Sequence, residues 1–341
     1  AIVFILLNSA GLLSYIFQVI LGRTLPPDQY GSFNSLLATG ALITTPITIL
    51  HLVFSRFIAR INVQKLQHIK SLLTISLKFI LCIALGIFLI GLSFSPWLKN
   101  FLNTETTLPI ILMLLAACFS SFQQIFIAVC EGMQRFLSLG MISGGGALAK
   151  ILFAILFVVI LGWGVEGGLL ALSFATFSAL AYGIWQLQDV FKAQAVDLHS
   201  NSLMEMARFS IPSFFMITMV SIMCNIDIVL ARHYCLPDQA GYYATATILG
   251  RIAFFLPSSL LMVLFPSVAK ATVSGSKDNH YLWVSLGLTF ILSGGVFLVF
   301  FIAGQSIVQL FYGEQYYSAV PILEIVSAAM GLLAMSRVIF S

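Results

Sequence analysis

Two basic residues lie deep inside long apolar stretches of this sequence, and they are its clearest candidates for chemistry. Lys150 and Arg251 are each about 11 residues from a stretch end, or roughly 16 Å at about 1.5 Å per residue. A charge at that depth in a bilayer is costly and usually faces a wet cavity or a partner. Lysine is a point charge toward phosphate, whereas arginine offers paired donors. We therefore expect the two cations to line one cavity and attract a diphosphate or an acidic sugar.

The alternative is that each cation is neutralised by a nearby group. Asp227 and Glu324 are the acids available for such a salt bridge, or for coupling, and both are expected toward the outer half of the membrane. Gln18, Gln124 and Asn225 supply amides at depth, which suit sugar hydroxyls but also hold helices together in lipid. The residue types alone leave both interpretations open.

Other kinds of site find little support. The five cysteines and five histidines are scattered, and no spacing among them suits a metal. Most of the cysteines fall inside or at the edge of apolar stretches, so no disulfide framework is indicated. The stretch "SGGGALAK" at Ser143–Lys150 lacks the ending of a phosphate loop, so its glycines indicate close helix packing or bending. We expect no metal, no cofactor and no nucleic-acid partner.

The elements that must position these residues are membrane helices. The chain is 60% hydrophobic and 8% charged, whereas a soluble domain carries roughly 25% charged residues. A spanning helix needs about 20 apolar residues, and the apolar runs do not alternate with polar residues as barrel strands would. The sequence predicts an all-α integral membrane protein of about ten spans. These cover residues 2–22, 32–55, 74–95, 109–130, 139–161, 165–187, 208–231, 240–266, 281–303 and 319–340.

The basic residues between these spans predict the orientation, because cytoplasmic loops are enriched in Lys and Arg. One set of loops holds Arg56, Arg60, Lys65, Lys70, Lys78, Arg135, Lys192, Arg208, Lys270 and Lys277. The opposite loops hold only Arg23, Lys99 and Arg232. The larger set is expected inside, together with the N-terminus. Segment 56–73 alternates basic and apolar residues at a helical period, so we expect an amphipathic helix on the cytoplasmic surface.

The sequence also contains a repeat. "PPDQYG" at Pro26–Gly31 returns as "LPDQAG" at Leu236–Gly241, and "VFSRFIAR" at 53–60 lies over "VLFPSVAK" at 263–270. With a shift of one or two positions, Pro109 matches Pro321. This indicates a duplicated six-helix unit, with bundles at 1–200 and 201–341. The second copy stops after its fourth helix, so we expect a longer protein with further helices and a short additional N-terminal piece.

The duplicated outer loop has a local interpretation. Pro and Asp favour a turn, and Gly accepts backbone angles that other residues avoid. We expect a tight outer hairpin in each half, and we keep a binding role open. The motif comprises Arg23, Pro27, Asp28, Gly31, Arg232, Pro237, Asp238 and Gly241.

These residues carry a family resemblance. "LGRTLPPDQYGSFNSLLA" at 21–38, "EGMQRF" at 131–136 and "DIVLARHYCLPDQAGYYATATILGR" at 227–251 resemble the polysaccharide-transport family of the multidrug/oligosaccharidyl-lipid/polysaccharide exporter superfamily. The resemblance implies two six-helix bundles around a cavity that opens alternately to each side. It further implies flipping of polyprenyl-diphosphate-linked oligosaccharides across a bacterial inner membrane, for surface polysaccharides such as the O-antigen of lipopolysaccharide. The implied partners are membrane lipids, a polysaccharide polymerase and glycosyltransferases.

Two other functions are open to such a chain. A cation-coupled drug exporter of the same superfamily tends to carry a functional acid in its first bundle, but Glu131 and Glu166 lie at the ends of predicted helices. A membrane polysaccharide polymerase or glycosyltransferase needs positioned titratable groups. The longest predicted outer loops, 96–108 and 304–318, hold one acid each. The flippase is therefore the favoured function, and we expect no enzyme.

Overall fold

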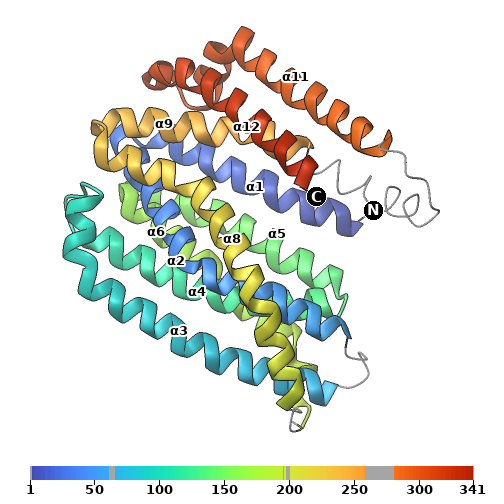
Figure 1. The fold of residues 1–341 in the computed structure, drawn as a ribbon. Coiled ribbons are helices and arrows are strands. Elements are labelled where there is room, and N and C mark those ends of the chain that lie inside the picture. The colour runs from blue at the N-terminus through green and yellow to red at the C-terminus, as the bar shows by residue number, and fades with distance from the viewer. Residues whose placement is uncertain (1, 61–65, 195, 197–199, 258–279, 341) are drawn as a thin grey trace. The chain divides into compact units, whose positions relative to one another are not determined.

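The computed structural model describes residues 2–60, 66–194, 196, 200–257 and 280–340, and these contain helices and no strand (Figure 1). The helices are α1 (Ile2–Thr24), α2 (Pro27–Arg60), α3 (Leu66–Phe101), α4 (Leu108–Gly132), α5 (Phe136–Ala154), α6 (Gly164–Gln186), α7 (Gln188–Lys192), α8 (Ser200–Tyr234), α9 (Pro237–Gly250), α11 (His280–Phe311) and α12 (Val320–Phe340). A π-helical turn, η1 (Ile155–Ile160), extends α5, and a 3₁₀ turn, η2 (Glu314–Ala319), precedes α12.

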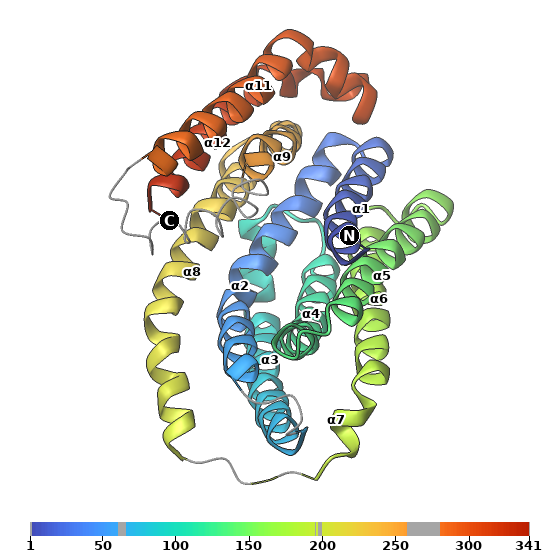
Figure 2. The same ribbon diagram turned by 90° about the vertical axis from the view of Figure 1, so that its right-hand side faces the viewer.

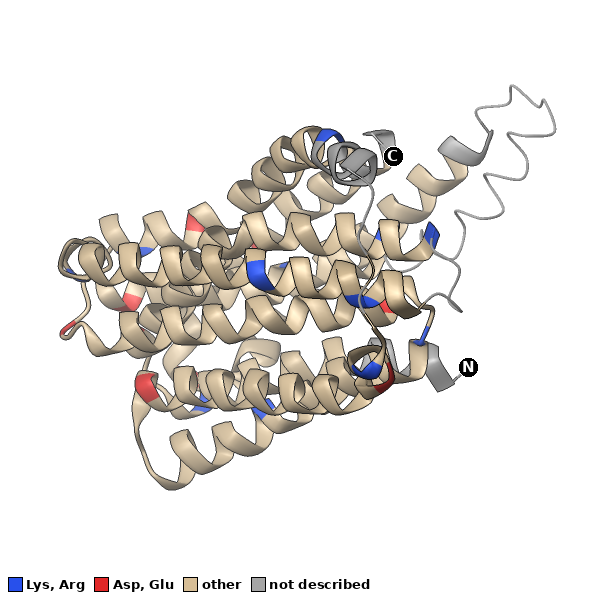
Figure 3. Cartoon of the chain, turned by 90° about the horizontal axis from the view of Figure 1, so that it is seen from below, with Lys and Arg blue, Asp and Glu red and all other residues tan. Residues whose placement is uncertain are grey.

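The prediction of an all-α membrane protein is confirmed. Within the described residues, eight helical segments are long and apolar enough to cross a membrane, in rough agreement with the ten spans expected. Charged residues are sparse along the helices (Figure 3). The span expected at 240–266 is interrupted, because α9 ends at Gly250 and Arg251 forms its C-cap. Its last residues, from 258, lie outside the described part, as does the repeat segment 263–270.

The expected amphipathic surface helix over 56–73 is wrong. Residues up to Arg60 belong to the last turns of α2, and Leu66 begins α3; residues 61–65 lie outside the described part. The apolar residues Ile58, Ile69 and Leu72 are buried in the protein core instead of lying at a lipid surface. Extending an existing helix is cheaper than nucleating a new one, so the periodic pattern continues the two membrane helices.

The chain forms two compact units. The first comprises residues 1–25 and 32–235, and the second comprises 26–31 and 236–341. Helix α8 therefore packs with the first unit, and the first residues of α2 pack with the second. The division at residue 200, which is drawn from the repeat, stays a prediction.

Small residues bring the helices of the first unit together. The main neighbours are α1 with α5, α5 with α6, α4 with α6, and α3 with α4 (Figure 2). A Cβ on Gly146 of α5 would lie 3.2 Å from the Ala179 Cβ of α6, and one on Gly183 would lie 3.1 Å from the Phe126 Cβ of α4. Close approach through small residues is how membrane helices gain packing energy without a hydrophobic effect between them.

The second unit packs α12 against both α9 and α11. At Gly250 of α9, an added Cβ would lie 2.8 Å from the Val326 side chain of α12, so this helix pair also approaches through a glycine. The turn η2 contacts α9, α11 and α12, and its Tyr316 and Ala319 are buried.

The sequence repeat has a counterpart in the helix ends. Three pairs of helix ends are 210 positions apart, which is the offset of the repeat. They are Thr24 and Tyr234 (234 minus 24), Pro27 and Pro237, and Phe101 and Phe311. Asn103 and Gly313, also 210 apart, both have a positive φ, of 47° and 97°. Each lies just after its helix, where such a residue commonly ends an α-helix.

Candidate functional site

Lys150 lies where α5 packs against α1 in the first unit. Its Nζ is 3.4 Å from the Ser14 Oγ and 5.4 Å from the centre of the Phe17 ring. Gln18 is four positions after Ser14 and so lies on the same face of α1. In the part of the chain that the structure describes, Lys150 makes no salt bridge. An ammonium group has three donors, and one hydroxyl and one ring make an incomplete set of partners for it.

The other predicted cavity residues are more dispersed. Gln124 is half-buried on α4, and Asp227 is half-buried on α8. Asn225 donates its amide to the Ser221 carbonyl of its own helix over 2.9 Å. Ser221 Oγ in turn lies 2.7 Å from Thr45 Oγ1, which links α8 to α2.

Arg251 and Glu324 belong to the second unit. Both are half-buried, the first at the end of α9 and the second on α12. Joint binding of one anion by Lys150 and Arg251 stays a prediction, as do the salt bridges expected with Asp227 and Glu324.

The duplicated loop is a tight turn in both halves, as predicted. Pro27 begins α2 and Pro237 begins α9, each after a two-residue connection. Proline suits the first helical position because its missing N–H would have no intrahelical partner there. Asp28 and Asp238 occupy the first turns, where a carboxylate is favoured by the helix dipole.

The two glycines of the motif explain why it occurs twice, because the two copies contact each other within the second unit. A Cβ on Gly31 would lie 2.6 Å from the Gly241 backbone nitrogen. A Cβ on Gly241 would lie 1.9 Å from the carbonyl oxygen of Pro27. Only glycine allows the first turns of α2 and α9 to approach this closely.

Tyrosines surround this contact, and the sequence reasoning missed them. The Tyr30 ring centre lies 5.7 Å from that of Tyr312 and 5.9 Å from that of Tyr316, in edge-on geometry. All three side chains are fully buried, and Tyr30 Oη donates to Tyr312 Oη over 3.5 Å. Tyr242, beside Gly241, also meets Tyr316 edge-on. The available signal was a tyrosine next to the motif in each copy.

The two motif arginines differ in environment. Arg23 is exposed, whereas Arg232 is only 6% exposed. Its Nε donates to the Leu102 carbonyl over 2.9 Å and its Nη2 to the Asn103 carbonyl over 2.8 Å. Asn103 returns a hydrogen bond to the Arg232 carbonyl over 3.3 Å. Arg232 thus satisfies carbonyls that the end of α3 leaves open, and the two helix ends cap each other.

Two polar pairs join helices at the ends that the topology prediction places inside. The His51 Nε2 of α2 lies 2.9 Å from the Glu131 Oε2 of α4. Arg135 binds Asp189 of α7 through both nitrogens of its fork, with Nη1 to Oδ1 at 3.1 Å. This hydrogen bonding lowers the pKa of Asp189 and raises the pKa of Arg135. Sequence spacing shows no sign of either pair, because the partners are far apart in the chain.

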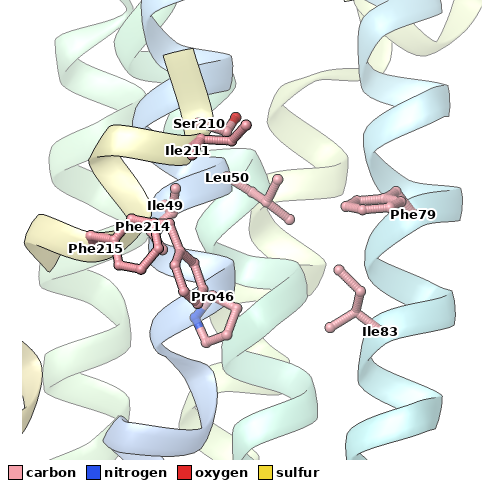
Figure 4. Close-up of a pocket in the computed structure, with 9 residues that line it drawn as sticks. All are labelled: Pro46, Ile49, Leu50, Phe79, Ile83, Ser210, Ile211, Phe214 and Phe215. Atoms are coloured by element: carbon pink, nitrogen blue, oxygen red, sulfur yellow. The ribbon is translucent and has the colours of Figure 1, made fainter. Parts of the chain in front are cut away.

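An apolar groove lies between α2, α3 and α8 in the first unit, with a volume of about 300 Å³. Figure 4 shows Phe79 and Ile83 directed from α3 toward the side chains of the other two helices. The lining residues are Pro46, Ile49, Leu50, Phe79, Ile83, Ser210, Ile211, Phe214 and Phe215. We call this the α2–α3–α8 groove. No local pattern in the sequence indicates it, because three separate helices form its walls.

Two further hollows lie in the first unit. One of about 430 Å³ lies along α1, α5 and α6 and is lined by the glycines at 144–146, so part of the glycine-rich stretch opens a space between these helices. The other, of about 210 Å³, lies among α2, α4 and α6. Its hydroxyls at Thr44, Ser120 and Thr176 bond to carbonyls of their own helices, so they offer little to a ligand.

Comparisons with known proteins bear on this arrangement. Residues 1–272 match the family model described as "Polysaccharide biosynthesis protein". No curated protein matches the chain.

Solved structures with the same fold are transporters. An inward-facing multidrug resistance MATE family transporter of the MOP superfamily is 14% identical, with 99% of this chain and 84% of that chain covered and a TM-score of 0.76. The MATE multidrug transporter DinF-BH is 14% identical, with 98% and 79% covered and a TM-score of 0.71. The lipid II flippase MurJ is 13% identical, with 99% and 74% covered and a TM-score of 0.70. At these identities the likeness is one of fold.

Proposed function

Since this chain belongs to the polysaccharide biosynthesis protein family, we propose that it flips a polyprenyl-diphosphate-linked oligosaccharide across the bacterial inner membrane. The observation that carries this proposal is the family match over residues 1–272. Support comes from the fold, which is shared with MOP-superfamily transporters and with the lipid II flippase MurJ. The proposed mechanism is alternating access, in which a substrate site opens to one side of the membrane at a time.

Lys150 is the residue that we propose for binding the diphosphate. Its ammonium group is held between α1 and α5 by one hydroxyl and one aromatic ring. A cation in such apolar surroundings attracts a phosphate more strongly than it would in water, because the local dielectric is lower. We propose Gln18, on the same face of α1 as Ser14, for the adjoining sugar hydroxyls, and Arg251 as a second cation for the same anion.

The cellular setting follows from this substrate. We propose that the N-terminus lies in the cytoplasm, where the lipid-linked oligosaccharide would be assembled by glycosyltransferases. A polymerase would use the flipped product on the other side, for example in building the O-antigen of lipopolysaccharide.

A second function has one observation in its favour, which is that two of the similar folds are multidrug transporters. A cationic drug would need a negative or neutral site in the membrane. Between α1 and α5 of the first unit, however, the structure places a basic side chain, Lys150, inside a membrane helix. Because like charges repel in a low-dielectric site, we favour the anionic lipid as substrate.

The proposal can be tested in bacterial cells that lack their own flippase for a surface polysaccharide. Expression of the full-length protein should restore the surface polymer, as measured by antibody binding to intact cells. Blotting would confirm protein abundance in the membrane. Unrestored surface polymer at normal abundance, together with efflux of a cationic dye, would favour the drug exporter.

A further inference from the structure

The α2–α3–α8 groove combines features that a plain lipid-facing surface does not have. Its walls come from three helices that are long and apolar enough to span a membrane, and Ser210 is its one polar lining residue. Exposed apolar side chains are ordinary on membrane helices, but here they surround a concave space. Its volume of about 300 Å³ is at the lower end of the range for ligand pockets, roughly 300–1,000 Å³.

A polar bridge joins α2 and α8 beyond one end of the groove. Thr45 precedes the lining residue Pro46 on α2, and Ser221 follows the lining residue Phe215 on α8. The two hydroxyl oxygens are 2.7 Å apart. In the predicted topology both residues lie on the outer side of the groove. A chain in the groove would therefore enter from the inner side.

Each wall carries an exposed basic residue toward that inner side. On α8, Arg208 is three positions before Ile211 and seven before Phe215, so it lies on the same face as both. On α3, Lys78 directly precedes Phe79 and its long stem can extend toward the membrane surface. On α2, Arg56 is seven positions after Ile49 and also on one face with it.

Arg208 and Lys78 are the cations on which the rim depends, because Arg56 follows Ser55, to which Glu131 of α4 bonds. Helix α3 contains no Asp or Glu, and the acid of α2 is Asp28 at its opposite end. On α8, Asp227 is 19 positions after Arg208 (227 minus 208), which at about 1.5 Å per residue is roughly 28 Å away; the side chain of Glu205 lies outside the described part. The groove thus pairs an apolar interior with a basic inner rim.

We propose that this groove docks the polyprenyl tail of the incoming lipid-linked substrate, with its diphosphate at the basic rim. This inference rests on the proposed function. The apolar walls match a hydrocarbon chain, the bridge beyond the outer end sets the direction of entry, and the rim matches an anionic head group. The first unit then has two subsites, a docking groove for the tail and Lys150 for the diphosphate at a later stage of transport.

The test is photolabelling of the purified full-length protein in nanodiscs. The probe is a sugar-free polyprenyl diphosphate with a diazirine in its tail, and labelled peptides are mapped by mass spectrometry. We expect labels on peptides containing Phe79 or Phe214, and competition by unlabelled polyprenyl diphosphate but not by a tenfold excess of phosphatidylglycerol. Equal competition by phosphatidylglycerol would make the groove a bulk-lipid site and overturn the inference, as would labelling elsewhere.

A matched pair of variants isolates the groove. Ile83→Trp fills it from α3, whereas Ile90→Trp places the same side chain two turns further along α3, at a position that is 62% exposed and outside the lining. We expect Ile83→Trp to lower labelling at least fivefold and Ile90→Trp to leave it within twofold. Equal labelling of the two variants contradicts the inference.

A second pair of variants avoids steric change. Arg208→Gln and Lys78→Gln should each weaken labelling two- to tenfold, and the loss should shrink at high salt because ions screen exposed charges. Unchanged labelling in both variants contradicts the role of the rim.

Flipping is measured separately on the same preparations. If the groove is labelled but no flipping is measured, the tail-docking inference holds and the proposed function fails. If flipping is measured but the label falls elsewhere, the proposed function holds and the tail-docking inference fails.

Discussion

Replacing Gly241 with alanine should lower the stability of the fold more than the addition of one methyl group to a helix usually does. The added Cβ would lie 1.9 Å from the Pro27 carbonyl oxygen and 2.5 Å from its carbonyl carbon. Both are backbone atoms at the start of α2, so neither can rotate away as a side chain could. The turns of α2 and α9 would have to separate by about 1.1 Å to restore the 3.0 Å minimum seen for real contacts, as 3.0 minus 1.9 shows.

The expected cost follows from two opposing effects. Overpacking a well-packed contact typically costs about 1–3 kcal/mol, and the required displacement here favours the upper end. Alanine is also a better helix former than glycine, by about 1 kcal/mol. The net destabilisation should therefore be about 2 kcal/mol for Gly241→Ala. Gly31→Ala should cost less, because its nearest atom would be 2.6 Å away.

The assay is thermal unfolding of the purified protein in detergent, followed by tryptophan fluorescence. Gly294→Ala is the matched control, because this glycine also lies in a helix of the second unit and an added Cβ would meet no atom within 4 Å. We expect the unfolding midpoint of Gly241→Ala to fall by about 4 °C and that of Gly294→Ala to stay level or rise. Equal midpoints for the two variants would refute the close-approach explanation of the repeated motif.

Three further predictions concern charged residues. Lys150→Ala should lower transport at least tenfold while Lys150→Arg retains part of it, measured as surface polysaccharide at matched abundance; normal export by the alanine variant would remove Lys150 from the site. Arg232→Met should cost about 2–3 kcal/mol, because hydrogen bonds from a charged group to two carbonyls are lost, and Arg23→Met, at an exposed position, should shift the melting midpoint far less. The lowered pKa of Asp189 means that its bond to Arg135 stabilises the fold above the carboxyl's ordinary pKa and is lost as pH falls through the lowered value. Because Asp189 is 41% exposed, that contribution should stay below about 1 kcal/mol, so Asp189→Asn should melt slightly below wild type at pH 7, and the difference should vanish as pH falls through the lowered pKa of Asp189.

The spans and turns can be predicted because they depend on local sequence. Apolar runs of spanning length form helices. The prolines at 27 and 237 begin helices, a position that suits a residue without a backbone N–H.

The segment 56–73 departs from its prediction for a physical reason. An apolar stripe facing protein and one facing lipid have the same period, and Ile58 and Ile69 face the protein core.

The contacts of the candidate site cannot be predicted in the same way. His51 with Glu131 and Arg135 with Asp189 meet only because their helices are neighbours, which no local pattern encodes. The repeated glycines are visible in the sequence, but a turn accounts for them fully until their mutual contact is known. Lys150 is correctly predicted as a cation inside a spanning helix, whereas its contacts with Ser14 and Phe17 depend on how α1 and α5 pack.

The central claim is tested most directly with the purified full-length protein in liposomes. The substrate is a polyprenyl-diphosphate oligosaccharide with a fluorescent sugar, placed in both leaflets, and a membrane-impermeant quencher reads the outer leaflet after the inner pool is allowed to exchange. Our account predicts that all of the fluorescence becomes quenchable in wild-type liposomes, while about half stays protected in protein-free liposomes and in liposomes with Lys150→Ala. Protection equal to that of protein-free liposomes in the wild-type sample, with the protein folded and inserted, would contradict it.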